Sequence, residues 1–136
     1  MRRPLVAGNW KMNGSREMTE TLVSGIGSGL TQSDAVDVVV CPPFVYLDLC
    51  SAAATGTPIA MGAQDLDTHE PGAFTGAIAA DMLVDIGCEF AILGHSERRS
   101  LYSESDADVG VKASVAAAKG LTPIICVGET REERES

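Results

Sequence analysis

Apolar residues fall into short runs along this chain, and amphipathic stretches separate the runs. The runs occupy residues 5–7, 36–41, 59–63, 90–93 and 124–127. They are rich in Val and Ile and mostly lack alternation with polar residues, a pattern that favours strands covered on both faces. The sequence therefore predicts five buried strands of the parallel kind.

Apolar residues with helical spacing fill the gaps between these runs. In the first gap, Met18, Leu22 and Ile26 follow one another at four-residue steps. Gly87 and Gly120 stand where the third and fourth helices are expected to stop. The predicted order is β-α-β-α-β-α-β-α-β, with one more helix opening at the charged end of the chain. The helical stretches lie at 18–30, 44–54, 81–86 and 105–119, and the charged end at 129–136.

Two α/β folds accommodate five parallel strands joined by right-handed helical crossovers: an open doubly wound sheet and part of a (β/α)8 barrel. The phosphate-binding patterns typical of the first fold, Gly-x-Gly-x-x-Gly after the first strand and Gly-Lys-Ser/Thr, do not occur. The rhythm is steady except for a long polar loop at 64–76, and loops of that length are usually functional. We therefore predict a (β/α)8 barrel, with residues 1–136 forming a single partial domain.

Composition narrows the classes of partner. The 136 residues include 10 basic and 19 acidic side chains, and the net charge of −9 disfavours nucleic acid and anionic membranes as partners. No apolar run approaches the roughly 20 residues of a membrane-spanning helix. The cysteines lie far apart, without a Cys-x-x-Cys pair, so we expect free buried thiols in a reducing cytoplasm rather than disulfides or a metal site. They are Cys41, Cys50, Cys88 and Cys126.

Segment 92–99 (ILGHSERR) places reactive side chains where an apolar run ends and a helix is expected to begin. His95 would lie near unpaired backbone N–H groups and the positive end of the helix dipole, which disfavours an imidazolium. A neutral imidazole can donate a hydrogen bond to a carbonyl oxygen where enolate charge develops. The alternative role of His95 is a helix cap, and that of Glu97 is a cap or an ion pair. The candidate partners of Glu97 are Arg98, Arg99 and Lys112.

A second polar cluster follows the first apolar run. Asn9 and Lys11 are two positions apart, so an extended chain points both side chains to one face, into the mouth of a barrel. The Lys11 ammonium is either solvated or part of a site for a phosphorylated or carbonyl substrate. Cys126 ends the last run at the same rim, where packing is favoured over a catalytic thiol, and Trp10 is expected to anchor the core or rim. Phe74, in the long loop, suggests a lid or an oligomer contact.

Taken together, these segments resemble the triosephosphate isomerase family. The resemblance runs from residue 4 to about residue 133, and segment 92–99 carries most of its specificity. The matching segments are 8–13 (GNWKMN), 62–64 (GAQ), 72–76 (GAFTG), 92–99 (ILGHSERR) and 126–130 (CVGET).

The resemblance implies a cytoplasmic enzyme of glycolysis and gluconeogenesis that interconverts dihydroxyacetone phosphate and glyceraldehyde 3-phosphate through an enediolate. No cofactor or metal is expected. By the resemblance, Lys11 neutralises substrate charge and Asn9 helps to orient the small phosphorylated triose. His95 polarises the carbonyl oxygens and shuttles protons between them, and Glu97 supports the site.

The resemblance also implies a homodimer, in which the loop around Thr75 reaches the neighbouring subunit. The residues expected at that interface are Gln64, Phe74, Thr75 and Gly76. The family commonly has glutamate after Phe-Thr-Gly, where this chain has Ala77. A cross-interface ion pair is therefore expected to be missing, with a modest effect, because exposed pairs contribute little.

A complete barrel of this kind needs roughly 250 residues, so this chain is expected to supply about the first five of eight strand–helix units. The family's glutamate base then lies outside the chain, and the chain alone is expected to be inactive. No glutamate near the end fits the motif of that base: Glu129, Glu132, Glu133 and Glu135. Two alternatives are a non-catalytic half-barrel that acts as an assembly module, since unpaired strand edges invite association, and another (β/α)8 enzyme of phosphorylated sugars.

Overall fold

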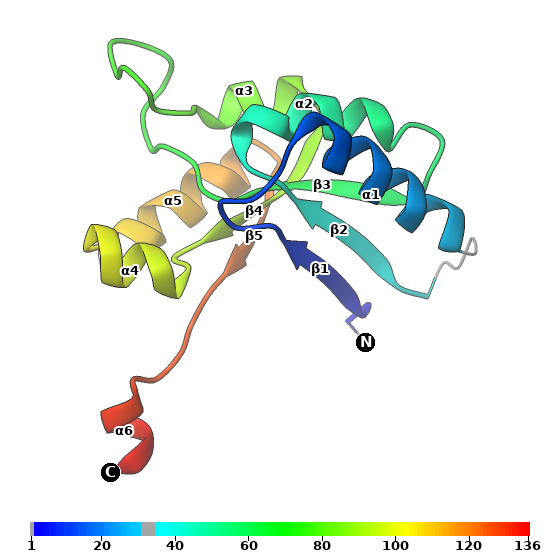
Figure 1. Cartoon of the computed structure of the whole chain (residues 1–136). Helices are drawn as coiled ribbons and strands as arrows, with labels where there is room; N and C mark the ends of the chain where they lie inside the picture. The colour runs from blue at the N-terminus through cyan, green and yellow to red at the C-terminus, as the bar shows by residue number, and fades with distance from the viewer. Residues whose placement is uncertain (1, 31–34) are drawn as a thin grey trace.

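The computed structural model describes residues 2–30 and 35–136. Five parallel strands form one sheet whose spatial order, β1-β2-β3-β4-β5, is the order of the chain. The strands are β1 (Leu5–Asn9), β2 (Asp37–Cys41), β3 (Ile59–Ala63), β4 (Cys88–Leu93) and β5 (Thr122–Ile125). With alternating helices they make a curled half-barrel, consistent with the first half of a (β/α)8, or TIM, barrel (Figure 1).

Six helices are described, and two of them, rather than one, connect β4 to β5. The prediction of a single helix there was wrong because Ser103 adopts a left-handed conformation, with φ of 56°, that ends α4. Ser105 then begins α5 with a capping box to Asp108. Figure 1 shows α6 apart from the sheet, at the end of an extended segment. The helices are α1 (Arg16–Gly29), α2 (Phe44–Ala53), α3 (Ala80–Asp85), α4 (Ser96–Tyr102), α5 (Asp106–Ala118) and α6 (Arg131–Glu135).

The two faces of the sheet are covered unequally. Val40 and Leu93 belong to a large core shared with the helices, whereas Val39 and Ile92 belong to a small cluster of strand residues, because successive strand positions face opposite sides. The prediction that all strands are covered on both faces was wrong at the edges, where the Val6 side chain of β1 is exposed. The helical members of the large core include Val23, Leu47, Leu83 and Val109.

The edge strands also differ from prediction in their ends. β1 continues to Asn9, and β5 begins at Thr122 and ends at Ile125 instead of spanning 124–127. The start of β5 was missed because proline usually argues against a strand, but Pro123 lies in an edge strand, where proline is tolerated. Cys126 lies just beyond β5, but its backbone N–H still donates to the carbonyl of Leu93 at 2.9 Å.

The predicted free thiols are buried in three of four cases. Burial raises the pKa of Cys41 to about 12 and those of Cys50 and Cys88 to about 11, whereas Cys126 is half-buried. Within residues 2–30 and 35–136, His, Cys, Asp and Glu do not gather in threes that could hold a metal ion. The helices of the same residues are too short or too polar to cross a membrane.

An ion network, formed by Asp65, Arg98, Glu104 and Lys112, joins the end of β3 to α4 and α5. Lys112 Nζ lies 2.8 Å from Asp65 Oδ1 and 2.7 Å from Glu104 Oε2, and Arg98 Nε lies 3.1 Å from Asp65 Oδ2 and 3.2 Å from Glu104 Oε2. The Glu104 side chain is 5% exposed. Its burial raises its pKa, but the hydrogen bonds and charges of Lys112 and Arg98 outweigh this effect and leave the pKa lowered. Glu104 is therefore ionised at neutral pH.

The close packing of β2 against β3 leaves no room for a side chain at position 62. The register of β3 and β4 shifts between Met61 and Gly62, and a Cβ at position 62 would lie 2.5 Å from Cys41 Sγ and 3.1 Å from Val39 Cγ1. We expect Gly62→Ala to lower the free energy of unfolding by about 1 to 3 kcal/mol through overpacking, measured by urea denaturation. Gly110→Ala, in α5 with open space around its Cβ, is the control and should be neutral or stabilising. Equal stability of Gly62→Ala and the parent chain would contradict this account.

The ion network has a pH signature that Glu104→Gln isolates. A carboxyl group whose pKa is lowered by folding stabilises the fold above its unfolded pKa, near 4.3, and this contribution disappears as pH falls through the folded pKa. Glu104→Gln should therefore cost about 2 kcal/mol at pH 7 and progressively less below about pH 4, as measured by urea denaturation. Glu132→Gln, on exposed α6, should cost nothing. A deficit for Glu104→Gln that is as large at pH 3 as at pH 7 would show that the charge is not what matters.

Candidate active site

Lys11, His95 and Glu97 meet at the carboxyl end of the sheet. Lys11 Nζ lies 2.8 Å from Glu97 Oε1, and His95 Nδ1 lies 3.4 Å from Glu97 Oε2. Lys11 follows β1 and His95 follows β4, and two strands lie between these in the sheet. A flat sheet would hold β1 and β4 roughly 14 Å apart, so the curl of the sheet is what lets the two side chains share one carboxylate.

His95 caps α4 with its ring. Its Nδ1 accepts a hydrogen bond of 3.1 Å from the backbone N–H of Glu97. An imidazole that accepts at Nδ1 carries its proton on Nε2, so this contact is the one that the Nε2–H tautomer makes. Capping and the presentation of a neutral imidazole, which the sequence left as alternatives, are thus compatible in one geometry. The protonated Nε2 is the ring atom left to donate to another molecule.

Glu97 pairs with Lys11 and not with the basic residues near it in sequence. The hydrogen bond and charge of Lys11 lower the pKa of Glu97. The alternative of a pair with Arg98, Arg99 or Lys112 is not what the structure shows. Arg98 and Arg99 follow Glu97 directly in α4 and point in other directions, and Lys112 lies in α5. Arg98 and Lys112 bind Asp65 and Glu104 instead, and Arg99 binds the carbonyl of Gly94.

Lys11 has a left-handed backbone, with φ of 54°. The prediction that Asn9 and Lys11 share one strand face therefore fails, because Lys11 lies outside β1 and strand alternation does not extend to it. The Asn9 side chain turns back, and its Oδ1 accepts from the Lys11 backbone N–H at 2.9 Å. A left-handed conformation costs a residue with a side chain roughly 1 to 3 kcal/mol, so the contacts that hold this backbone matter.

Gln64 supplies the other contacts that hold Lys11. Its Nε2 donates to the Lys11 carbonyl at 2.8 Å and to the Cys41 carbonyl at 2.8 Å. It thereby links the ends of β1, β2 and β3. The sequence analysis placed Gln64 only at a dimer interface and missed this role, although its position directly after the third strand, at the same rim, was a usable signal. Trp10 is buried, as predicted.

The other residues expected at a dimer interface lie in the loop 64–76, which projects from the body of the protein (Figure 1). Phe74 is 44% exposed, and its ring stacks on His69 with centroids 3.8 Å apart. His69 in turn contacts Asp67, with Nδ1 and Oδ1 2.7 Å apart. Thr75 and Gly76 are exposed beside Phe74. The loop is thus organised by its own contacts and presents an aromatic ring outward.

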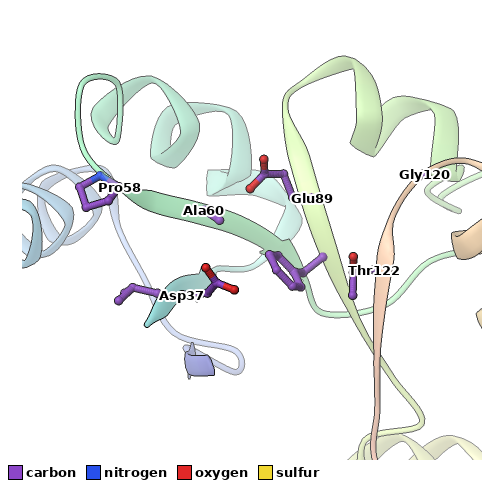
Figure 2. A pocket seen from close by; sticks show the side chains of 8 residues that line it. Asp37, Pro58, Ala60, Glu89, Gly120 and Thr122 are labelled. Carbon is purple, nitrogen blue, oxygen red and sulfur yellow. The ribbon is translucent and has the colours of Figure 1, made fainter. Parts of the chain in front are cut away.

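A separate cleft of about 390 Å³ opens at the other end of the strands. Figure 2 shows its lining, which comes from the starts of the strands and the segments before them. The cleft contains Asp37, which pairs with Arg3 at 3.0 Å, and Glu89, but neither Lys11 nor His95. Active sites of (β/α)8 barrels lie at the carboxyl ends of the strands, so position and chemistry both favour the rim that holds Lys11 and His95.

The arrangement at that rim suits a small anion that carries a carbonyl group. An ammonium can neutralise negative charge, and an imidazole N–H can stabilise charge that develops on a carbonyl oxygen. The Lys11 ammonium is half-exposed and its present partner, Glu97, is half-exposed too, so an anionic ligand could compete for it.

Known proteins match this chain over almost its whole length. The family model described as triosephosphate isomerase matches residues 4–136. The triosephosphate isomerase of Rhodopirellula baltica is 54% identical over 135 residues, which are 99% of this chain and 53% of the relative. That of Albidiferax ferrireducens is 54% identical over 136 residues, 100% of this chain and 55% of the relative.

A third relative, the triosephosphate isomerase of Nitrosococcus oceani, is 53% identical over 135 residues, which are 99% of this chain and 54% of the relative. The chain spans about half the length of the curated relatives that it matches. Because the family model matches the chain almost from end to end, the chain belongs to the triosephosphate isomerase family.

Proposed function

We propose that this chain is the N-terminal part of an enzyme that interconverts dihydroxyacetone phosphate and glyceraldehyde 3-phosphate through an enediolate, without a cofactor. The observation that carries the proposal is the meeting of Lys11 and His95 through Glu97, in a chain of this family. The reaction belongs to glycolysis and gluconeogenesis, and the enzyme is cytoplasmic.

His95 acts on the oxygen atoms of the substrate. A base removes the proton from one carbon, and electron density moves onto the carbonyl oxygen of the neighbouring carbon. The Nε2–H of His95 donates to that oxygen as its charge develops, and the ring then moves protons between the two oxygens of the enediolate. The Glu97 amide at Nδ1 supports this role because it keeps the proton on Nε2.

Lys11 acts on the charge of the substrate. The net charge of −9 repels a phosphate, so a local cation is needed to hold one. The ammonium is already held at the mouth by Glu97, and the substrate phosphate or the enediolate takes over part of that contact on binding. Asn9 fixes the backbone of Lys11 and so orients the ammonium toward the substrate.

The base that removes the carbon proton comes from outside these 136 residues. Within residues 2–30 and 35–136, Glu97 is the one carboxylate in ion-pair contact with Lys11 or His95. Its oxygen is held by the Lys11 ammonium, and its lowered pKa makes it a weak proton acceptor. The chain alone, as a partial barrel, is therefore inactive.

The complete enzyme is a homodimer in which the loop 64–76 contacts the neighbouring subunit. The exposed ring of Phe74, pre-ordered by its stack on His69, supports this proposal, since a large exposed aromatic ring at a loop tip suits a partner surface. Ala77 replaces the family's usual glutamate and removes an ion pair at the rim of that contact, with little loss of affinity.

A second candidate, a non-catalytic half-barrel that assembles with other chains, is favoured by the exposed edge strands. Val6 on β1 and Ile125 on β5 are 61% and 48% exposed, and each strand lies at an edge of the sheet. Such edges pair readily with further strands. Activity and association of the same chain discriminate between the two candidates.

Replacing Lys11 in the complete enzyme tests the assignment of the cation. We expect Lys11→Met to lower kcat/KM by about 100-fold or more, because a preorganised charge at the reacting centre is lost. The binding of phosphoglycolate, an enediolate mimic, should weaken in parallel. Arg3→Met is the control, because Arg3 pairs with Asp37 at the opposite end of the strands and its loss should leave the rate unchanged. Retained activity in Lys11→Met would remove Lys11 from the site.

The purified 136-residue chain tests the missing base. We expect its isomerase activity to equal the background rate of the assay, while circular dichroism reports the mixed helix and strand content described here. Turnover near that of whole enzymes would show that the rest of the barrel is not required. Sedimentation of the same sample tests the second candidate. If the half-barrel is an assembly module, the chain should sediment as a defined oligomer and not as a monomer.

A further inference from the structure

Both polar backbone groups of Gly94, the residue between β4 and His95, are bound by charged side chains. The N–H donates to Glu104 Oε1 at 3.0 Å in a buried contact, and the carbonyl accepts from Arg99 Nε at 2.7 Å. That carbonyl belongs to the peptide group that joins Gly94 to His95. Its orientation therefore determines the direction in which the His95 backbone starts.

The Arg99 guanidinium uses three separate N–H groups on three acceptors. Nε binds the Gly94 carbonyl, one terminal nitrogen binds the Cys126 carbonyl at 3.2 Å, and the other binds the carboxylate of Asp106 at the start of α5. A planar fork of fixed donors can serve three diverging acceptors at once, which the single ammonium of a lysine cannot do with the same geometry. Arg99 thus connects the segment after β4, the segment after β5 and α5.

The backbone at Gly94 fits closely against this guanidinium. Gly94 has φ of +69°. A Cβ there would lie 2.9 Å from Arg99 Nη2, the nitrogen that binds the Cys126 carbonyl, and 2.6 Å from Val109 Cγ2. The next residue, His95, has its carbonyl bound by the backbone N–H groups of Arg98 and Arg99. These contacts hold the backbone on both sides of His95, so the main remaining freedom at this residue is the rotation of its side chain.

We propose that Arg99 is a positioning residue for His95: by holding the Gly94 and Cys126 carbonyls, it fixes the backbone that keeps His95 Nδ1 on the Glu97 amide. The inference rests on the proposed function only in that Nε2 is the atom that meets the substrate. The charged groups around the ring make the positioning necessary, because the Glu97 carboxylate, itself paired with Lys11, lies 3.4 Å from Nδ1. A ring that leaves the amide meets an acceptor that favours a proton on Nδ1.

The test is made on the imidazole itself, without turnover. The chain has two histidines, so two-bond ¹H–¹⁵N spectra of the ¹⁵N-labelled 136-residue chain report the tautomers of His95 and His69 in one sample. Arg99→Gln should raise the fraction of His95 protonated on Nδ1 by roughly two- to tenfold. This is the factor by which the loss of one hydrogen bond typically changes an equilibrium constant. His69, bound to Asp67 in the projecting loop, is the internal reference and should not change.

Matched variants separate positioning from loss of structure. Arg131→Gln, on exposed α6, should leave both histidines unchanged, and Arg99→Lys should give an intermediate His95 spectrum because one of three contacts is kept. Asp106→Asn keeps an acceptor oxygen but removes the negative charge of the exposed anchor of Arg99, and it should shift His95 in the same direction by less. If Arg99→Gln does not fold, the spectra of Arg99→Lys and Asp106→Asn test the positioning of His95 in its place.

Two outcomes overturn the inference: an unchanged His95 tautomer in folded Arg99→Gln, or an unchanged tautomer in both milder variants. Either result leaves the proposed isomerase intact, since the complete enzyme could still be active. Conversely, a complete enzyme without isomerase activity would contradict the proposed function while leaving the spectrum of His95 as expected. The two proposals therefore fail separately.

Discussion

The contact between Lys11 and Glu97 is the interaction on which the rest of this structure's chemistry depends. It spans from the end of β1 to the first turn of α4, across two intervening strands, and it exists only because the sheet curls. Within that sheet, β3 and β4 shift register at Gly62, a position with no room for a side chain. A flat sheet of the same five strands would carry the same residues without joining them.

Two groups of ion pairs near this rim differ in their exposure to water. Glu104 and Asp65 are held by Lys112 and Arg98 in a network that is partly removed from water and that joins α4 to α5. At the mouth, Lys11 and Glu97 are half-exposed and exchange partners at small cost. A ligand can therefore compete with Glu97 for Lys11 while the ion network keeps its geometry.

The sequence was sufficient for the strands, their parallel order and the rim at which His95 and Lys11 lie, because these follow from local hydrophobic pattern and from the direction of parallel strands. It was insufficient for the left-handed backbone of Lys11, which depends on Gln64, 53 positions away. The partner of Glu97 was missed for the same reason, since Lys11 lies 86 positions before it and reaches it only across the curled sheet. The break after α4 depends on one left-handed residue, Ser103, whose type gives no signal.

The central claim is that one small sugar phosphate contacts both Lys11 and His95. A crystal structure of the complete enzyme with phosphoglycolate bound tests it most directly. The account predicts one ligand molecule with its anionic groups within ion-pair distance of Lys11 Nζ and within hydrogen-bond distance of His95 Nε2, and Nδ1 still on the Glu97 amide. A ligand that binds elsewhere, or that reaches only one of the two nitrogens, would contradict it.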